Sequence, residues 1–304
     1  MNPLNLKVNI GGIPFQNPII AASGTFGFGL EYEDYTDLNQ LGGISIKGLT
    51  LSPRKGNPPP RIAETASGIL NSVGLQNPGV DHFLNQDLPA LKKYNTIIIA
   101  NINGNTIEEY CRLAEKLQDA PIDLVELNVS CPNVKEGGVA FGTDPEMVYT
   151  ITKTLKDVTR QPLMVKLTPN VTHITQTALA AQEGGADALS LINTLLGMSI
   201  DANTRRPILA NITGGLSGPA IKPIALRMVW EVCQVVTIPV IGMGGIMTGE
   251  DVVEFLLAGA TAVSVGTANL VSPYAMIDII EELKAYMEVN GIRDVEELIG
   301  GLII

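Results

Sequence analysis

Polar residues close five of the short apolar runs in this sequence, and their types suit a flat polar ligand. Three runs end in asparagine, at Asn101, Asn128 and Asn193, and two end in lysine, at Lys47 and Lys166. An amide offers both donors and an acceptor, which the edge of a pyrimidine or a flavin ring can pair with. A lysine neutralises a carboxylate, or the charge that a flavin gains on reduction. One such residue alone more often caps a helix or extends to solvent, but five together favour a ligand site.

Glycine-rich turns follow the last two apolar runs. Gly244 and Gly245 stand between one run and a helical pattern, Gly266 and Thr267 follow the next run, and Gly218 lies in a further turn, GGLSG. Backbone N–H groups exposed beside a helix N-terminus bind phosphate. Tight turns also need glycine for their geometry alone. Because these turns follow the last two runs, they predict a phosphate site.

Cys131 lies just past Asn128 in the string NVSCPN. A buried free cysteine usually packs as a small hydrophobe. However, a thiol has an ordinary pKa of about 8.5, which shifts easily toward neutrality, so Cys131 is a candidate general base. Cys111 and Cys233 fall in helical patterns and are expected to pack. The scattered cysteines and the lack of an HExxH pattern predict no disulfide framework, iron–sulfur cluster or metal site.

A glycine turn near residue 74 is a further candidate. In AETASGILNSVGLQNPG, Asn71 and the backbone from Ser72 through Val73 and Gly74 to Leu75 are expected to approach the ligand, although a plain turn explains the glycine better when this segment is taken alone.

Eight apolar runs, each followed by a helical pattern, must position these residues. This alternation predicts parallel βα units, and the count of eight favours an α/β fold of the (β/α)8 TIM barrel type over a doubly wound open sheet. Helices are expected to begin after Thr106, Asp144 and Thr248. The runs span residues 18–22, 43–47, 96–101, 124–128, 163–167, 188–193, 239–242 and 262–266.

Long loops are expected after strands 2, 4 and 6, over residues 48–85, 130–143 and 194–219. Loops that follow strands lie at the C-terminal face of a barrel, where active sites form. Residues 1–304 are expected to form one barrel domain. The net charge of −11 disfavours nucleic acid, and the absence of a signal peptide or an apolar spanning segment predicts a cytoplasmic protein without membrane contact.

Ordered strings along nearly the whole chain resemble the catalytic subunit of the dihydroorotate dehydrogenase family, particularly its class 1B, NAD-linked branch. These strings are AASGTFG at Ser23, SIKGLTLSPRKGNPPPR at Lys47, NSVGLQNPG at Asn71, NVSCPN at Asn128, VKLTPN at Lys166, INT at Asn193, GGLSG at Gly218, GMGGI at Gly244 and VGTAN at Gly266.

The resemblance implies an FMN-binding barrel that oxidises dihydroorotate to orotate in pyrimidine (UMP) biosynthesis. It assigns FMN to Ser23, Lys47, Gly48, Asn101, Asn128, Lys166, Ile192, Gly218, Gly244, Gly245, Gly266 and Thr267. It assigns dihydroorotate or orotate to Lys47, Asn71, Ser72, Val73, Gly74, Leu75, Asn128, Asn193 and Thr194. Cys131 matches the catalytic base, which takes the C5 proton while C6 delivers hydride to FMN, and residues 132–142 would close over the substrate.

The same resemblance implies a partner. In class 1B members electrons pass to NAD through a second subunit that carries FAD and a 2Fe-2S cluster, on a homodimer core within a heterotetramer. Two alternatives stay open: a stand-alone class 1A-like enzyme that uses fumarate, and a non-redox barrel that binds a phosphorylated metabolite or serves as an interaction scaffold.

Overall fold

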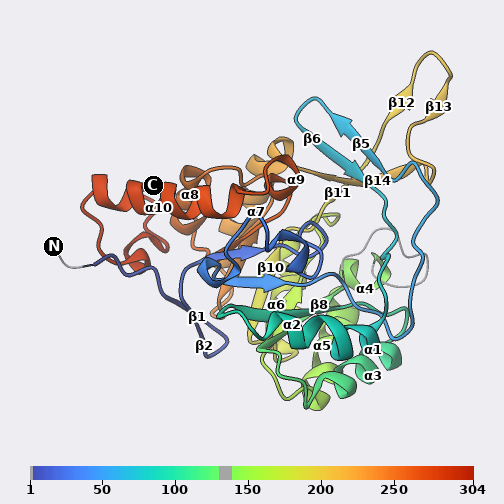
Figure 1. Cartoon of the computed structure of the whole chain (residues 1–304), viewed down its shortest axis with the longest axis horizontal. Coiled ribbons are helices and arrows are strands. Elements are labelled where there is room, and N and C mark those ends of the chain that lie inside the picture. The colour runs from blue at the N-terminus through green and yellow to red at the C-terminus, as the bar shows by residue number, and fades with distance from the viewer. Residues whose placement is uncertain (1–2, 130–138) are drawn as a thin grey trace.

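Eight parallel strands close into a barrel within residues 3–129 and 139–304, the part of the chain that this computed structural model describes (Figure 1). Each strand overlaps one of the eight predicted runs, so the predicted TIM barrel is confirmed. Around the barrel the strands are β3 (Ile19–Ala21), β4 (Gly43–Ser45), β7 (Ile97–Ile102), β8 (Leu124–Asn128), β9 (Leu163–Lys166), β10 (Ala188–Leu191), β15 (Val240–Met243) and β16 (Ala262–Val265).

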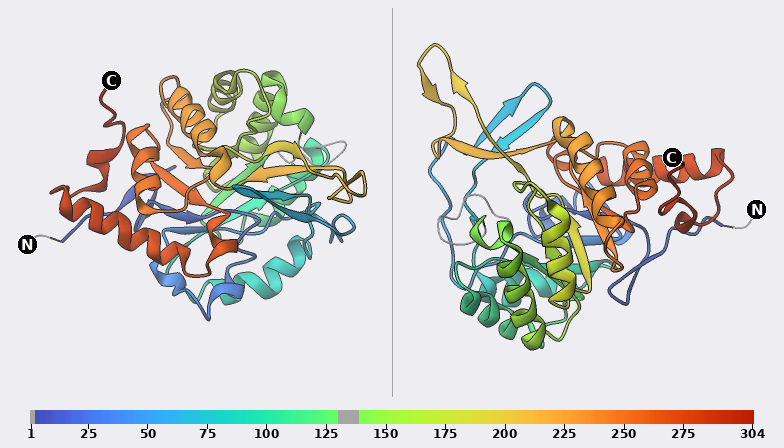
Figure 2. Two further views of the ribbon diagram at one scale, coloured as in Figure 1. Left: turned by 90° about the horizontal axis from the view of Figure 1, so that it is seen from above. Right: turned by 180° about the vertical axis from the view of Figure 1, so that it is seen from behind.

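Helices surround these strands (Figure 2). The long ones are α3 (Ile107–Leu117), α5 (Pro145–Val158), α6 (Ile174–Glu183), α7 (Lys222–Cys233), α8 (Gly249–Leu257) and α10 (Ala275–Val289). The three predicted helix starts are confirmed: the side chains of Thr106, Asp144 and Thr248 accept backbone N–H groups of the first turns of α3, α5 and α8. Shorter helices are α1 (Val80–His82), α2 (Leu88–Leu91), α4 (Val139–Thr143) and α9 (Ala268–Val271), and a π-helical turn, η3 (Phe83–Asp87), joins α1 to α2.

The first βα unit departs from the expected pattern. After β3 the chain forms two 3-10 turns, η1 (Leu30–Tyr32) and η2 (Leu38–Gln40), in place of an α-helix. Gly24, Gly27 and Gly29 all have positive φ angles here, and successive backbone reversals of this kind interrupt a helix. Two further 3-10 turns are η4 (Pro219–Ile221) and η5 (Val295–Leu298).

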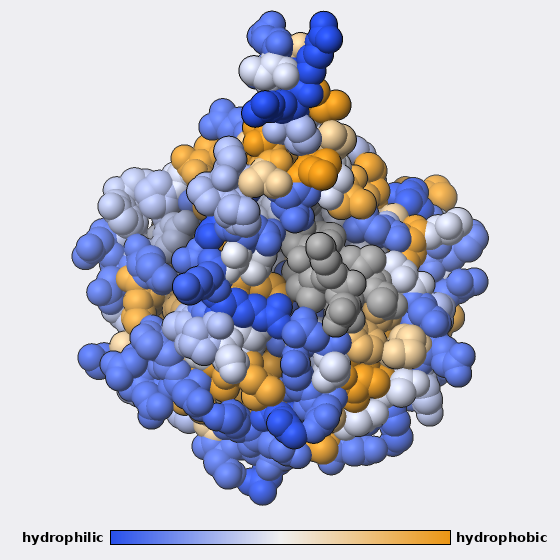
Figure 3. Space-filling model, turned by 90° about the vertical axis from the view of Figure 1, so that its right-hand side faces the viewer, coloured by the Kyte–Doolittle hydropathy of each residue, from blue (hydrophilic) through white to orange (hydrophobic). Residues whose placement is uncertain are grey.

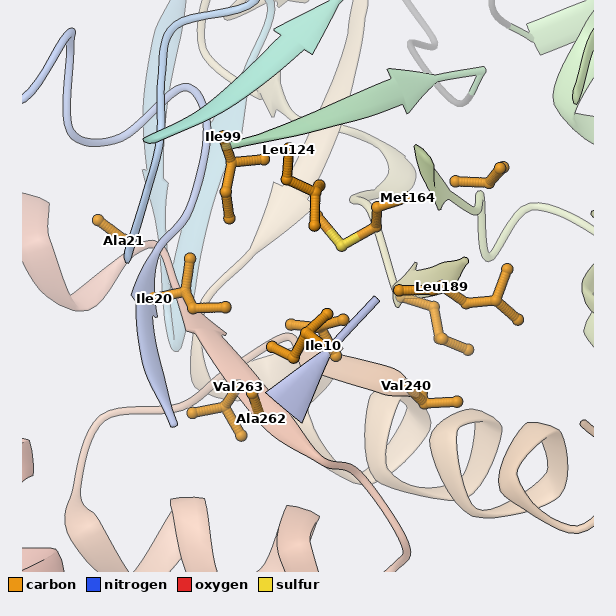
Figure 4. Packing of buried hydrophobic residues seen from close by; sticks show 14 of the residues in the cluster. Ile10, Ile20, Ala21, Ile99, Leu124, Met164, Leu189, Val240, Ala262 and Val263 are labelled. Atoms are coloured by element: carbon orange, nitrogen blue, oxygen red, sulfur yellow. The ribbon is translucent and has the colours of Figure 1, made fainter. Parts of the chain in front are cut away.

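An N-terminal hairpin fills the end of the barrel at which the strands begin. It consists of β1 (Val8–Ile10) and β2 (Ile13–Phe15). Ile10 is fully buried, and Figure 4 shows it among Ile20, Leu189, Val240 and other apolar side chains of the barrel strands. This end is therefore packed with apolar side chains, which leaves the opposite end for a ligand.

A second, antiparallel sheet lies beside the barrel, on the side away from both termini (Figures 1 and 2). Its order is β11 (Leu195–Met198), β14 (Thr213–Ser217), β6 (Gly68–Asn71) and β5 (Ile62–Thr65). The hairpin of β12 (Ile200–Asp201) and β13 (Arg206–Pro207) extends from it. Figure 3 shows the hydrophilic tip of a projecting arm with hydrophobic residues at its base, and the strand β11 exposes Leu196 and Met198.

Two of the segments predicted as long loops thus contain strands. The segment after the second barrel strand supplies β5 and β6, and the segment after the sixth supplies β11 to β14. The two segments pair with each other, from Gly215 opposite Asn71 to Ser217 opposite Ile69. Such pairing between distant segments leaves no local pattern in the sequence from which it could be predicted. Most of the segment predicted after the fourth strand, residues 130–138, lies outside the described residues.

Candidate active site

A cavity of about 240 Å³ opens at the C-terminal ends of the barrel strands, and residues of β5, β6 and β14 form one wall. Every residue predicted to hold the cofactor lines it: Ser23, Lys47, Gly48, Asn101, Asn128, Lys166, Ile192, Gly218, Gly244, Gly245, Gly266 and Thr267. Of the residues predicted to hold the substrate, Asn71, Val73, Gly74, Leu75, Asn193 and Thr194 also line it. The roles of these residues stay predictions.

A hydrogen-bonded set of amides forms part of the cavity floor. Asn101 on β7 donates from Nδ2 to the carboxylate of Glu126 at 2.6 Å. Its Oδ1 accepts from Asn103 at 2.9 Å and from Asn128 at 3.5 Å. Asn101 is fully buried, and Asn128 is 8% exposed. The amides are therefore held in place by protein contacts before any ligand arrives.

Lys166 brings a buried cation to the same floor. It ends β9 directly opposite Asn128 of β8, and it is 4% exposed. Within residues 3–129 and 139–304 its ammonium group has no hydrogen-bond or ion-pair partner, although it lines the cavity. Burying a cation without a partner is costly. An anionic group in the cavity would supply that partner.

Glycine turns form a further part of the cavity lining, called here the glycine wall. Gly218, Gly244 and Gly245 have φ angles of 97°, 129° and 78°, which only glycine adopts without strain. A Cβ atom on Gly245 would lie 2.7 Å from the Cβ atom of Lys222 and 2.9 Å from the carbonyl oxygen of Gly218. These turns therefore require glycine, and they bring backbone close to the cavity.

A partly buried ion pair holds this wall. Lys222, at the start of α7, donates to Asp251 at 2.6 Å and to Glu254 at 3.0 Å on α8. Asp251 also accepts the backbone N–H groups of Met247 and Thr248. Burial alone would raise the pKa of Asp251, but these hydrogen bonds outweigh it and hold that pKa below its ordinary value. The contacts fix the start of α8 relative to the Gly244–Gly245 turn.

Ser72 is the one predicted substrate residue in the described chain that does not line the cavity. Its side chain and its carbonyl oxygen both accept hydrogen bonds from Asn57, at 3.1 Å and 3.0 Å, and it is 1% exposed. Side chains alternate in direction along an extended segment, so Asn71 and Val73 reach the cavity while Ser72 turns away. The predicted approach of the Ser72 backbone to the substrate stays a prediction.

Several lining residues were not predicted from the sequence. They are Ala22, Gly24, Thr25, Ile62, Ile69, Ser217, Ile221, Met243, Ser264 and Leu270. Most are apolar or small, and nothing in their local pattern separates them from core residues. Glu126, beneath the floor, did carry a signal, because it is a charged residue inside the apolar run DLVELN.

Cys131 lies outside the described residues, as does most of the predicted closing loop 132–142. Among the residues that are described, no cluster of three or more His, Cys, Asp and Glu could hold a metal ion, and no helix has both the length and the apolar composition needed to cross a lipid bilayer.

Comparison with known proteins identifies the family. The sequence profile described as dihydroorotate dehydrogenase matches residues 5–287. The chain belongs to the dihydroorotate dehydrogenase family. The resemblance stated from the motifs is thus confirmed, and the chain is an oxidoreductase of a family that implies a flavin cofactor and a place in pyrimidine biosynthesis.

Curated members of the dihydroorotate dehydrogenase family match over their full length. A protein of Alkaliphilus metalliredigens is 62% identical over 99% of this chain and 100% of its own. One of Geotalea uraniireducens is 57% identical over 100% of both chains, and one of Thermoanaerobacter pseudethanolicus is 56% identical over 98% and 99%. All three are named the catalytic subunit of dihydroorotate dehydrogenase B (NAD(+)).

A solved structure shares the fold. The dihydroorotate dehydrogenase of Eimeria tenella, in complex with ferulenol, superposes with a TM-score of 0.81 at 24% identity, over 98% of this chain and 88% of that one. At this identity the match supports the barrel fold alone.

Proposed function

We propose that this chain is the catalytic subunit of an NAD-linked dihydroorotate dehydrogenase and oxidises dihydroorotate to orotate in UMP synthesis. The observation that carries the proposal is the meeting of Lys47, Asn101, Asn128 and Lys166 in one cavity that the glycine wall also lines. The names of curated relatives at 54–62% identity support the NAD-linked type.

FMN is the proposed cofactor, and two observations fit it. Lys166 is a buried cation whose ammonium group has no partner among the described residues. Glycine turns line the same cavity, and one of them, Gly266–Thr267, directly precedes the short helix α9. When bound, FMN supplies a two-electron acceptor. Lys166 would then balance negative charge at the ring, and the turns at Gly218, Gly244–Gly245 and Gly266–Thr267 would hold the phosphate. The remaining residues assigned to FMN are Ser23, Lys47, Gly48, Asn101, Asn128 and Ile192.

Dihydroorotate would lie between the FMN site and the second sheet. Lys47 would pair with its carboxylate, and the side chains of Asn71, Asn128, Asn193 and Thr194 would hydrogen-bond to its ring edge. The backbone from Val73 to Leu75, where Gly74 and Leu75 have φ angles of 75° and 55°, would pack on it and exclude water. Cys131 Sγ would accept the proton from C5 of the substrate, as its motif NVSCPN implies.

A partner subunit completes the proposal. The relatives are named catalytic subunits, which implies a further subunit in those enzymes. In the NAD-linked branch that subunit carries FAD and a 2Fe-2S cluster and passes electrons to NAD, with two catalytic chains at the core of a heterotetramer. A chain that instead reduced fumarate without a partner would be of the class 1A type.

The test is the visible spectrum of the purified chain, recorded anaerobically before and after dihydroorotate is added. Flavin bands that bleach on addition support the cofactor and the substrate together, whereas a chain that binds no FMN overturns the proposal.

Cys131→Ala should keep the bands but slow their bleaching on the order of 100-fold. Cys111→Ala, in helix α3, is the matched control and should bleach as the unmodified chain does. Copurification with an iron–sulfur flavoprotein distinguishes the NAD-linked enzyme from the fumarate-dependent one.

A further inference from the structure

A buried carboxylate lies directly beneath the cavity floor and has no place in the proposed chemistry. Glu126 is on β8, two residues before Asn128, and is 1% exposed. Its Oε2 accepts from Ser45 and from Asn101, each at 2.6 Å, and its Oε1 accepts from Ser190 at 2.7 Å. No lysine or arginine of the described residues forms an ion pair with it.

The contacts of Glu126 leave Asn101 one favourable amide orientation. A carboxylate that receives three donors acts as an acceptor only, so the NH2 group of Asn101 must face it. The Oδ1 atom of Asn101 then faces the other way, where it accepts from Nδ2 of Asn103 and of Asn128. Turning the amide over would set oxygen against the carboxylate and NH2 against NH2, which leaves buried polar groups unpaired.

We infer that Glu126 is a positioning residue that fixes the amide orientation of Asn101 and, through Asn101, that of Asn128. Glu126 does not line the cavity, whereas both asparagines do. The carboxylate of Glu126 thus determines whether the amide oxygen or the NH2 group of each asparagine faces the bound rings. This inference rests on the proposed function, because that proposal places both asparagines against FMN and one of them also against dihydroorotate.

Substitutions of Glu126 separate orientation from charge. Glu126→Gln removes the charge but retains an oxygen that can accept from Asn101 and Ser45, while its NH2 group can donate to the hydroxyl of Ser190. Glu126→Asp keeps the charge but is one methylene shorter, so its oxygens no longer reach Asn101. Glu126→Met keeps the length of the side chain and removes every acceptor.

The measurements are the KM for dihydroorotate and the Kd for FMN of the intact chain. We expect Glu126→Gln to stay within about threefold of the unmodified chain, and Glu126→Asp and Glu126→Met to raise both constants by about 10- to 100-fold. Ser190→Ala, which removes a contact of Glu126 but not the one to Asn101, is the control and should change neither constant more than about threefold.

A double-mutant cycle tests whether Glu126 acts through Asn101. In an Asn101→Ala background, Glu126→Asp should raise the Kd for FMN no further. If Glu126→Asp weakens FMN binding in that background as much as it does in the unmodified chain, the inference is overturned. It is also overturned if Glu126→Gln is as impaired as Glu126→Asp, because the effect would then come from the charge. If Glu126→Met does not fold, Glu126→Gln and Glu126→Asp still test the inference, because opposite results are expected for these two variants. Unmodified protein that fails to bind FMN overturns the proposed function itself, whereas FMN binding that is equal in all variants overturns only the role of Glu126.

Discussion

The substitution Gly245→Ala tests whether the glycine wall is needed to bind FMN phosphate. Two costs follow from the structure. The φ angle of 78° places an alanine in the left-handed region, which costs about 1–2 kcal/mol. The new Cβ atom would also lie 2.7 Å from Cβ of Lys222 and 2.9 Å from its backbone nitrogen. Overpacking of this kind costs about 1–3 kcal/mol, so the free energy of unfolding should fall by about 2–5 kcal/mol.

Lys222 cannot easily move to relieve this contact, because Asp251 and Glu254 hold its ammonium group. The Gly244–Gly245 turn must shift instead, and its N–H groups move with it. A loss of about 1.4 kcal/mol in binding already corresponds to a tenfold change, so we expect the Kd for FMN to rise by about tenfold or more.

Gly12→Ala is the matched control. Gly12 has a similar φ angle of 84°, but it has no atom within 4 Å of an added Cβ and lies in the turn between β1 and β2 at the other end of the barrel. It should lose only about 1–2 kcal/mol of stability and bind FMN normally. Urea unfolding and titration of flavin fluorescence measure both quantities. Equal FMN affinity in the two variants would refute the assignment of this turn to the cofactor.

Two further predictions concern contacts that hold the site. Lys222→Met should lower the free energy of unfolding by about 1–3 kcal/mol at neutral pH. Because hydrogen bonds lower the pKa of Asp251 below 3.8 in the folded chain, this stabilisation is present above that pH and is lost as the pH falls through the lowered value. The difference between the two proteins should therefore shrink in urea unfolding at acid pH, and a constant difference would contradict the assignment. Tyr110→Phe removes the 2.7 Å hydrogen bond to the carbonyl oxygen of Asn128 and should cost about 1 kcal/mol by urea unfolding, whereas an unchanged midpoint would show that this bond contributes nothing.

The barrel could be predicted from the sequence because its strands are local. The run Leu124–Asn128 is buried on both faces and coincides with the observed strand. The cavity followed from the same rule, since residues just past parallel strands must meet at one end of a barrel. Lys47 follows β4, whereas Asn101 and Lys166 lie in β7 and β9, and all three line one cavity.

The features that were missed depend on contacts between distant segments. β6 and β14 pair although more than a hundred residues of chain separate them. The other partner of each strand is close in the sequence, β5 for β6 and β11 for β14. The side-chain direction of Ser72 could not be predicted either, because the motif gives the segment but not which side chains face the cavity. Whether residues 1–304 form one domain stays a prediction.

The pairing of β6 with β14 ties together two insertions that arise from opposite parts of the barrel. In this pairing Leu70 lies opposite Leu216, so a change in the length of one strand must be matched by a change in the other if the register is to be kept. A deletion of one residue in either strand would turn its inward side chains outward. The two segments should therefore have been inherited as a matched pair. A chimera that exchanges only one of them with a distant relative should lose the wall of the cavity, while an exchange of both should keep it.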